Sequence, residues 1–167
     1  MMTRRTTALG IFGVALAGLG LSRLFGQPSE AKGMETFEVS YPDAEWKRRL
    51  TPGQYRILRG HGTEFPGSSA LNAEKRQGTF ACAGCDKGLF LSSTKFESGT
   101  GWPSFFQPIE GAVGTTRDTS LMMARTEVHC ARCGGHLGHV FDDGPKPTGL
   151  RYCMNGDAMT FRPSTQS

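Results

Sequence analysis

The sequence lacks any long run of basic residues. After the N-terminal segment the longest such run is Lys47-Arg48-Arg49, and aromatic residues are not interleaved with basic ones. The formal net charge of the whole chain is only +4. Because nucleic-acid binding depends on neutralising many phosphates, we expect no nucleic-acid partner.

The sequence also has no low-complexity segment and no apolar run of comfortable membrane-spanning length. The uncharged stretch from Ala8 to Leu21 is well below the roughly 20 residues that cross a bilayer as a helix. Hydrophobic residues make up 37% and charged residues 20% of the chain, which excludes disordered and collagen-like proteins. A length of 167 residues then leaves room for one domain and an added tail.

Glycine, in contrast, is abundant. The 23 glycines argue against a helical bundle and favour turn-rich β structure. Two short helices are expected at the start, Asp43 to Leu50 and Gly53 to Arg59, the second with Thr51 as N-cap and Pro52 at its first position. The expected fold is mainly β and antiparallel, with this small helical N-terminal cap. The candidate strands are Thr79–Ala81, Gly88–Ser92, Val113–Thr116, Leu121–Val128, His139–Phe141, Arg151–Met154 and Met159–Arg162.

The first 31 residues are typical of an export signal. Arg4 and Arg5 precede the uncharged stretch, and Ser29-Glu30-Ala31 offers small residues for cleavage after Ala31. The adjacent arginines resemble a bacterial twin-arginine signal, although Thr6-Thr7 replaces the usual apolar pair. We therefore predict a signal peptide over residues 1–31, a domain over 32–167 and a periplasmic or exported protein. The alternative is that this segment stays uncleaved as an anchor, which would be the only expected contact with a membrane. A buried N-terminal helix is disfavoured by the five glycines between residues 10 and 26.

The chain holds five cysteines, an odd number that cannot all pair with one another. Two Cys-x-x-Cys pairs, Cys82/Cys85 and Cys130/Cys133, predict a tetrahedral four-thiolate site for one zinc ion. Gly88 and Gly134-Gly135 are expected to permit the sharp backbone turns after each pair. Two disulfides, or redox-active Cys-x-x-Cys pairs, are the alternative, since export permits disulfides.

The fifth cysteine, Cys153, lies in the apparent strand segment Arg151-Tyr152-Cys153-Met154-Asn155. Strand alternation places Arg151, Cys153 and Asn155 on one face, where a guanidinium favours the reactive thiolate. The alternative is a buried structural thiol.

Two histidines, His136 and His139, stand three residues apart and are suited to proton transfer. Zinc ligation and core packing are the competing roles, although four thiolates already complete a tetrahedral site. His61 and His129 are weaker candidates.

Trp102 lies in a loop shaped by glycine and proline, from Ser98 to Phe106. It can form a rigid aromatic wall that receives a small apolar group. A simple packed turn is the alternative.

Four motifs together resemble the B class of methionine sulfoxide reductases. They are the paired Cys-x-x-Cys, Gly-Thr-Gly-Trp-Pro-Ser-Phe at 99–105, Gly-His-Leu-Gly-His-Val-Phe at 135–141 and Gly-Leu-Arg-Tyr-Cys-Met-Asn at 149–155. Similarity also extends through Leu-Thr-Pro-Gly-Gln-Tyr at 50–55 and Arg-Gly-His-Gly-Thr-Glu at 59–64, and covers roughly residues 37 to 162. The resemblance implies a fold of two antiparallel sheets with a structural zinc away from the reaction centre.

The resemblance also implies an activity, reduction of the R epimer of methionine sulfoxide, mainly within oxidised proteins. It makes Cys153 the nucleophile, left as a sulfenic acid after methionine is released. By motif position, His139 and His136 are the imidazoles of the site, Trp102 and Phe141 the apolar walls for the substrate methyl, and Asn155 and Arg151 the polar supports.

One position departs from the family pattern. Many members carry a resolving cysteine where this chain has Thr100, so an internal disulfide with Cys153 is not expected. We predict regeneration by an external thiol donor of thioredoxin or glutathione type, and a monomeric protein.

Two other functions remain open from the residues alone. One is a cysteine hydrolase, for which no oxyanion-hole motif is found, and the other is a zinc-ribbon binding module without chemistry.

Overall fold

The computed structural model describes residues 36–120 and 123–165. The predicted signal or anchor at 1–31 lies outside these residues. Within the described ranges, no helix has both the length and the apolar character needed to cross a membrane.

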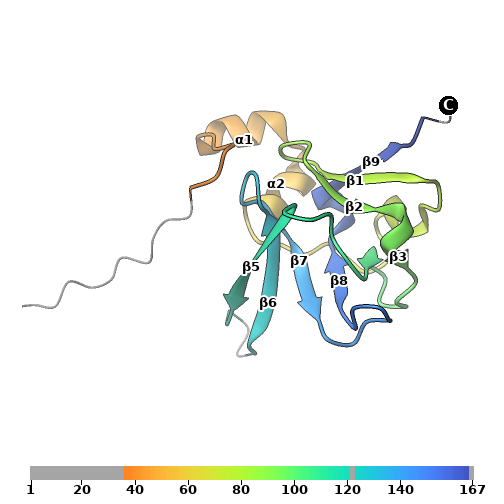
Figure 1. The fold of residues 1–167 in the computed structure, drawn as a ribbon. Helices are drawn as coiled ribbons and strands as arrows, with labels where there is room; N and C mark the ends of the chain where they lie inside the picture. The colour runs from red at the N-terminus through yellow and green to blue at the C-terminus, as the bar shows by residue number, and fades with distance from the viewer. Residues whose placement is uncertain (1–35, 121–122, 166–167) are drawn as a thin grey trace, which may run out of the picture. The chain divides into compact units, whose positions relative to one another are not determined.

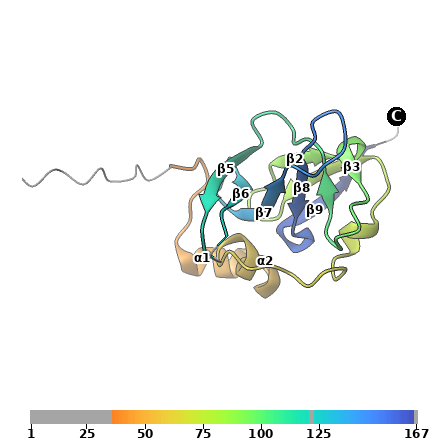
Figure 2. The ribbon, with the colours of Figure 1, turned by 90° about the horizontal axis from the view of Figure 1, so that it is seen from below.

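Both predicted helices are confirmed. Helix α1 spans Asp43–Arg49 and α2 spans Pro52–Leu58, with Thr51 as the N-cap of α2. The Thr51 hydroxyl accepts a hydrogen bond from the Gln54 amide N–H at 3.3 Å, and the Gln54 side chain accepts one from the Thr51 amide at 3.0 Å. This reciprocal capping satisfies two amides that a helix start otherwise leaves unpaired. Figures 1 and 2 show the helices together, and α2 packs against β7.

The strands form two sheets in which every pairing is antiparallel, as predicted. The smaller sheet has the order β2-β1-β9, and the larger has the order β3-β4-β8-β7-β6-β5 (Figure 1). The strands of the smaller sheet are β1 (Gly78–Cys82), β2 (Gly88–Leu91) and β9 (Met159–Pro163). Those of the larger are β3 (Lys95–Phe96), β4 (Ser104–Phe105), β5 (Val113–Asp118), β6 (Arg125–Cys130), β7 (His136–Phe141) and β8 (Arg151–Met154).

The expected strand set differs from this one in three main ways. Strands β3 and β4 were not predicted, because two residues each are too few to show alternation. Strand β7 begins at His136 rather than His139, since Gly138, which looks like a strand breaker, is part of its ladder. The predicted strand Leu121–Val128 corresponds to β6 from Arg125, and residues 121–122 lie outside the described ranges.

An aromatic cluster joins the two sheets. The ring of Phe105 on β4 stacks on that of Phe90 on β2, with centroids 4.3 Å apart, and meets the ring of Phe80 on β1 edge to face at 4.9 Å. All three side chains are fully buried. Since burying one such ring stabilises a fold by about 2–3 kcal/mol, this cluster holds the larger sheet in place for the site that it carries.

Candidate functional site

The four paired cysteines form one cluster. Their sulfur atoms all lie within 4.8 Å of one another, with Cys82 Sγ 3.7 Å from Cys133 Sγ and Cys85 Sγ 3.5 Å from Cys130 Sγ. A zinc ion with four bonds of 2.3 Å places its ligand atoms about 3.8 Å apart. The structure describes every cysteine of the chain, and all are free thiols, so the disulfide alternative is wrong for this structure.

The two Cys-x-x-Cys turns have the same backbone. The Asp86 amide donates to the Cys82 carbonyl at 2.8 Å, and the Gly134 amide donates to the Cys130 carbonyl at 2.9 Å. Both residues adopt the left-handed conformation, with φ of 65° at Asp86 and 66° at Gly134. The expectation for Gly134 is confirmed. That for Gly88 is wrong, because Asp86, which tolerates this conformation, makes the first turn.

The cluster fits a metal ion chemically as well as geometrically. Cys82, Cys130 and Cys133 are almost fully buried. Hydrogen bonding to the neighbouring thiols lowers the pKa of Cys130 and raises that of Cys82. Four thiolates are also the donor set that structural zinc prefers. The cysteines therefore form a site compatible with a structural metal ion.

Cys153 lies in the middle of the larger sheet. Strand β8 runs between β4 and β7, so Cys153 pairs with Ser104 on one side and with His139 on the other. Side chains paired in this way are on one face, with Cβ atoms about 5 Å apart. Gly138 allows the close approach, because a Cβ there would lie 2.1 Å from the Cys153 carbonyl oxygen.

A pocket of about 150 Å³ opens over Cys153. Four of the sequence-predicted residues line it together with Cys153, namely Trp102, His139, Phe141 and Asn155. The remaining wall comes from Thr63, Arg125 and Gly138. The pocket thus combines a thiol, an imidazole and two aromatic rings.

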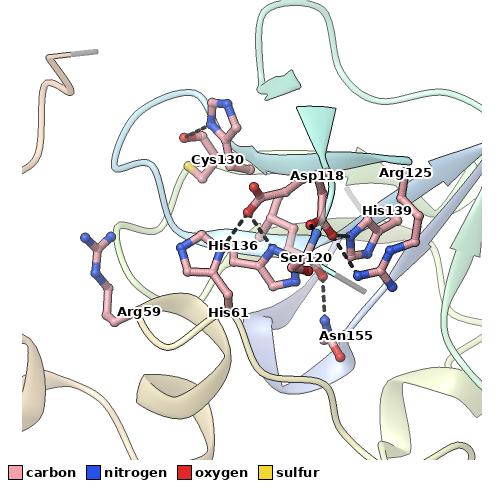
Figure 3. A network of polar contacts seen from close by, with 12 residues as sticks. Arg59, His61, Asp118, Ser120, Arg125, Cys130, His136, His139 and Asn155 are labelled. Atoms are coloured by element: carbon pink, nitrogen blue, oxygen red, sulfur yellow. Dashed lines mark hydrogen bonds and ion pairs between the residues drawn. The ribbon is translucent and has the colours of Figure 1, made fainter. Parts of the chain in front are cut away.

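His139 is held by a carboxylate that the sequence did not indicate. Its Nε2 donates to Asp118 Oδ2 at 2.8 Å, and Arg125 donates to the same oxygen at 2.7 Å (Figure 3). Hydrogen bonds from Ser120 lower the pKa of Asp118, which stays ionised. Burial lowers the pKa of His139, so its imidazole is neutral at pH 7 with the proton on Nε2. Its Nδ1 is then available as a proton acceptor.

His136 lies next to the pocket rather than in its lining. Its Nδ1 donates to Glu127 Oε1 at 2.6 Å, and its ring meets that of His139 edge to face with centroids 5.5 Å apart. His61 contacts the same Glu127 oxygen at 2.9 Å. The histidine classed as weaker in the sequence therefore belongs to the surroundings of the site. The ring of His129 contacts Phe37 instead.

Arg151 bonds both oxygens of Asp143 at 2.8 Å and lies over the Phe141 ring, 4.5 Å from its centroid. The hydrogen bonds to Asp143 raise the pKa of Arg151, and the neighbouring Cys153 side chain raises it further. The guanidinium thus lies near the thiol, as predicted, and also fixes one aromatic wall.

Asn155 directly follows β8, which ends at Met154, but its backbone is still extended and it lines the same pocket as Cys153. Its amide side chain donates to the Leu137 carbonyl at 3.0 Å and accepts from the Glu64 amide at 3.1 Å. Both ends of the side chain therefore bind backbone, and Asn155 shapes the pocket that it lines.

Glu64 is a further residue that sequence analysis missed. Its side chain is buried and accepts hydrogen bonds from the Gly156 and Asp157 amides at 2.7 and 2.8 Å, while its carbonyl accepts one from Trp102 Nε1 at 3.3 Å. Glu64 thereby ties the Trp102 loop to the segment after Cys153. A lone glutamate in a loop carries no pattern that predicts this role.

Thr100 is adjacent to the thiol. Its hydroxyl lies 3.8 Å from Cys153 Sγ and within 2.9 Å of the Ser98 hydroxyl. A side chain at position 100 is therefore within reach of Cys153.

Comparison with known proteins gives one consistent result. The SelR domain family matches residues 50–163. A peptide methionine sulfoxide reductase MsrB of Agrobacterium fabrum is 56% identical over 127 residues, 75% of this chain and 94% of that protein. Proteins of the same name from Pseudomonas putida and Methanosarcina barkeri are 58% and 54% identical, over 71% and 74% of this chain and 90% and 88% of their own. The chain therefore belongs to the MsrB family of peptide methionine sulfoxide reductases.

Proposed function

We propose that this enzyme reduces the R epimer of methionine sulfoxide in oxidised proteins, through a sulfenic acid on Cys153 that an external thiol regenerates. One observation carries the proposal: Cys153 and His139 are neighbours across β7 and β8, in a pocket walled by Trp102 and Phe141. Family membership supports sulfoxide reduction, and the pocket supports the details below.

The first step needs a nucleophile and an acid together, since a sulfoxide sulfur becomes electrophilic only when its oxygen is protonated. His139 Nδ1 accepts the proton of the Cys153 thiol and then gives it to the sulfoxide oxygen. The Cys153 thiolate attacks the sulfur of the protonated sulfoxide and forms an S–S bond. The hydroxyl group then moves to the Cys153 sulfur as the S–S bond and the substrate's sulfur–oxygen bond break, which leaves S–OH on Cys153 and releases methionine. The sulfoxide is reduced to methionine and the thiol oxidised, with no net proton consumed.

Asp118 is the positioning residue for this transfer, since it fixes the His139 ring and stabilises its protonated form. We expect Asp118→Asn to lower kcat by at least about 10²-fold, the scale of general acid–base catalysis. Because Asp118 raises the pKa of His139, the rise of kcat with pH should move to lower pH in the variant. A pH–rate profile measures both effects. An unchanged pH dependence would rule out the coupling, and Glu97→Gln, at an exposed carboxylate, is the matched control.

Epimer choice follows from the positions of the walls. If the methyl group contacts Trp102 and Phe141, the oxygen of one epimer faces His139 and Arg125. In the epimer of opposite configuration at sulfur, oxygen and methyl exchange places, so the oxygen meets apolar rings and loses its proton donor. The pocket is therefore proposed to select one epimer, and the resemblance to the family makes R the proposed one.

Regeneration requires a thiol from outside, since the other four cysteines form the metal cluster. An incoming thiol attacks the sulfur of the sulfenic acid, water leaves, and a second thiol reduces the mixed disulfide to restore Cys153. Thioredoxin-like proteins and small thiols both have this chemistry.

The experiment that tests this mechanism is a single turnover without added thiol. The wild-type protein should release one methionine per chain and retain one trappable sulfenic acid on Cys153. Thr100→Cys should instead yield an internal disulfide with Cys153, since position 100 is already within reach. Mass spectrometry distinguishes the two products. An internal Cys153 disulfide in the wild type would refute the proposal, and so would a stable sulfenic acid in a well-folded variant.

The ion in the cysteine cluster is proposed to be zinc. Cys82, Cys85, Cys130 and Cys133 would hold it, and when bound it would supply a structural cross-link between two turns and take no part in the reaction. We also propose a monomer, exported through residues 1–31. Fractionation of cells and N-terminal sequencing test the export, and an uncleaved cytoplasmic protein would contradict it.

A further inference from the structure

Three side chains outside the cysteine cluster converge beside the active-site pocket. The Nδ1 atoms of His61 and His136 lie 2.9 and 2.6 Å from Oε1 of Glu127, and all three donor atoms are within 4.8 Å of one another (Figure 3). His61 follows α2, Glu127 is on β6 and His136 is on β7. Separate parts of the chain thus present two imidazoles and one carboxylate to a single point.

The spacing of these donors matches one face of a metal coordination shell. With bonds of about 2.1 Å to nitrogen and oxygen, neighbouring ligand atoms at a right angle lie about 3.0 Å apart. The two distances between an imidazole nitrogen and the Glu127 oxygen, 2.9 and 2.6 Å, are slightly shorter than this. An ion could therefore bind after only small side-chain movements. It would replace the protons that now lie between each imidazole and the carboxylate.

The chemical state of the donors also suits a cation. One oxygen of the Glu127 carboxylate is in contact with both imidazoles. The side chains of His136 and Glu127 are 3% and 13% exposed, whereas that of His61 is 63% exposed. Two donors are thus shielded from solvent, and the third stands at an opening through which an ion can enter.

The opening leads into a second pocket of about 280 Å³. Besides the three donors it is lined by Thr63, Asp118, Ser120, Arg125 and His139. The Arg125 guanidinium is paired with the Asp118 carboxylate, and Thr63 and Ser120 offer oxygen partners to water molecules that complete a coordination shell. His61 is held at its edge by the adjoining backbone. Its φ is 52°, the next amide, that of Gly62, donates to the Arg56 carbonyl at 3.0 Å, and Arg56 donates to the Thr63 carbonyl at 3.0 Å.

We propose that His61, Glu127 and His136 form a facial two-histidine, one-carboxylate site for a divalent transition-metal ion. The site is separate from the cysteine cluster and needs none of its thiols. Imidazole and carboxylate together favour zinc, cobalt or nickel over calcium or magnesium. The site's existence does not depend on the proposed reaction mechanism.

The test uses the full-length chain with the cysteine cluster already loaded with zinc, and with Cys153→Ser to remove the remaining thiol. Zn²⁺ is titrated while calorimetry measures stoichiometry and ¹⁵N NMR follows the imidazoles. We expect one further equivalent to bind, with the Nδ1 signals of His61 and His136 changing together and those of His129 unchanged. Binding through the two histidines would then be observed atom by atom.

Variants separate the site from adventitious binding. His61→Ala should weaken binding of the second zinc equivalent by at least about tenfold. Because the His61 side chain is exposed, this variant should still fold. Glu127→Gln should do the same, whereas Glu97→Gln, at an exposed carboxylate elsewhere, should leave binding unchanged. The proposal is overturned if no second equivalent binds at millimolar Zn²⁺, or if the affinity survives His61→Ala.

Discussion

Replacing Cys153 with serine is expected to lower single-turnover reduction of methionine sulfoxide by at least about 10³-fold, the scale seen when a catalytic nucleophile is removed. A serine hydroxyl is a much weaker nucleophile than a thiolate and does not form a sulfenic acid. The measurement is methionine released per chain in the absence of a reductant. The substrate pocket should persist, because serine occupies nearly the same volume and the pocket's other walls are unchanged.

Metal content is the control for this variant. Cys153 is not one of the four clustered cysteines, so Cys153→Ser should retain its metal ion and its unfolding temperature. Retained turnover in a metal-loaded, folded variant would remove Cys153 from its proposed role.

Cys130→Ser should have the opposite outcome, loss of metal and of the fold. Cys130 is completely buried and closes the cluster with Cys85. Binding of a structural zinc contributes about 10–16 kcal/mol in small zinc domains, which exceeds or equals the usual stability of a whole domain, about 5–15 kcal/mol. Elemental analysis and circular dichroism measure the two losses. A metal-free protein with unchanged thermal unfolding would contradict a structural role for the ion.

The two cysteine variants therefore serve as controls for each other. Each variant replaces one sulfur atom with oxygen. Cys130 lies in the cysteine cluster, whereas Cys153 lies in the pocket. Loss of activity without loss of metal or folding distinguishes Cys153 from Cys130.

Those features of the fold and site that depend on short-range pattern were predictable from the sequence. The spacing of Cys82/Cys85 and Cys130/Cys133 predicted one cluster, and the helix-start signal at Thr51-Pro52 predicted α2. The motif around His139 and that around Cys153 predicted two segments that the structure pairs directly. Family membership leaves no basis for the cysteine hydrolase or for a zinc-ribbon module without chemistry.

The carboxylates of the site were not predictable in the same way. Asp118 reaches His139 from β5, and Glu127 reaches His136 from β6, through strand pairing that no local motif specifies. Glu64 acts from a loop that shows no periodicity. Asn155 lines the Cys153 pocket from one residue past the end of β8, and its side-chain partners, the Leu137 carbonyl and the Glu64 amide, come from distant segments. Long-range register, rather than composition, decides each of these contacts.

The central claim is that the Cys153 pocket reduces one epimer of methionine sulfoxide. The most direct measurement gives the enzyme a peptide carrying either the R or the S sulfoxide, with dithiothreitol and then with thioredoxin, and counts the methionine formed. We expect repeated turnover of the R epimer and at least about 10²-fold slower reduction of the S epimer, because the S epimer loses its proton donor. Equal reduction of both epimers, or reduction of the S epimer alone, would contradict the proposed role of the pocket.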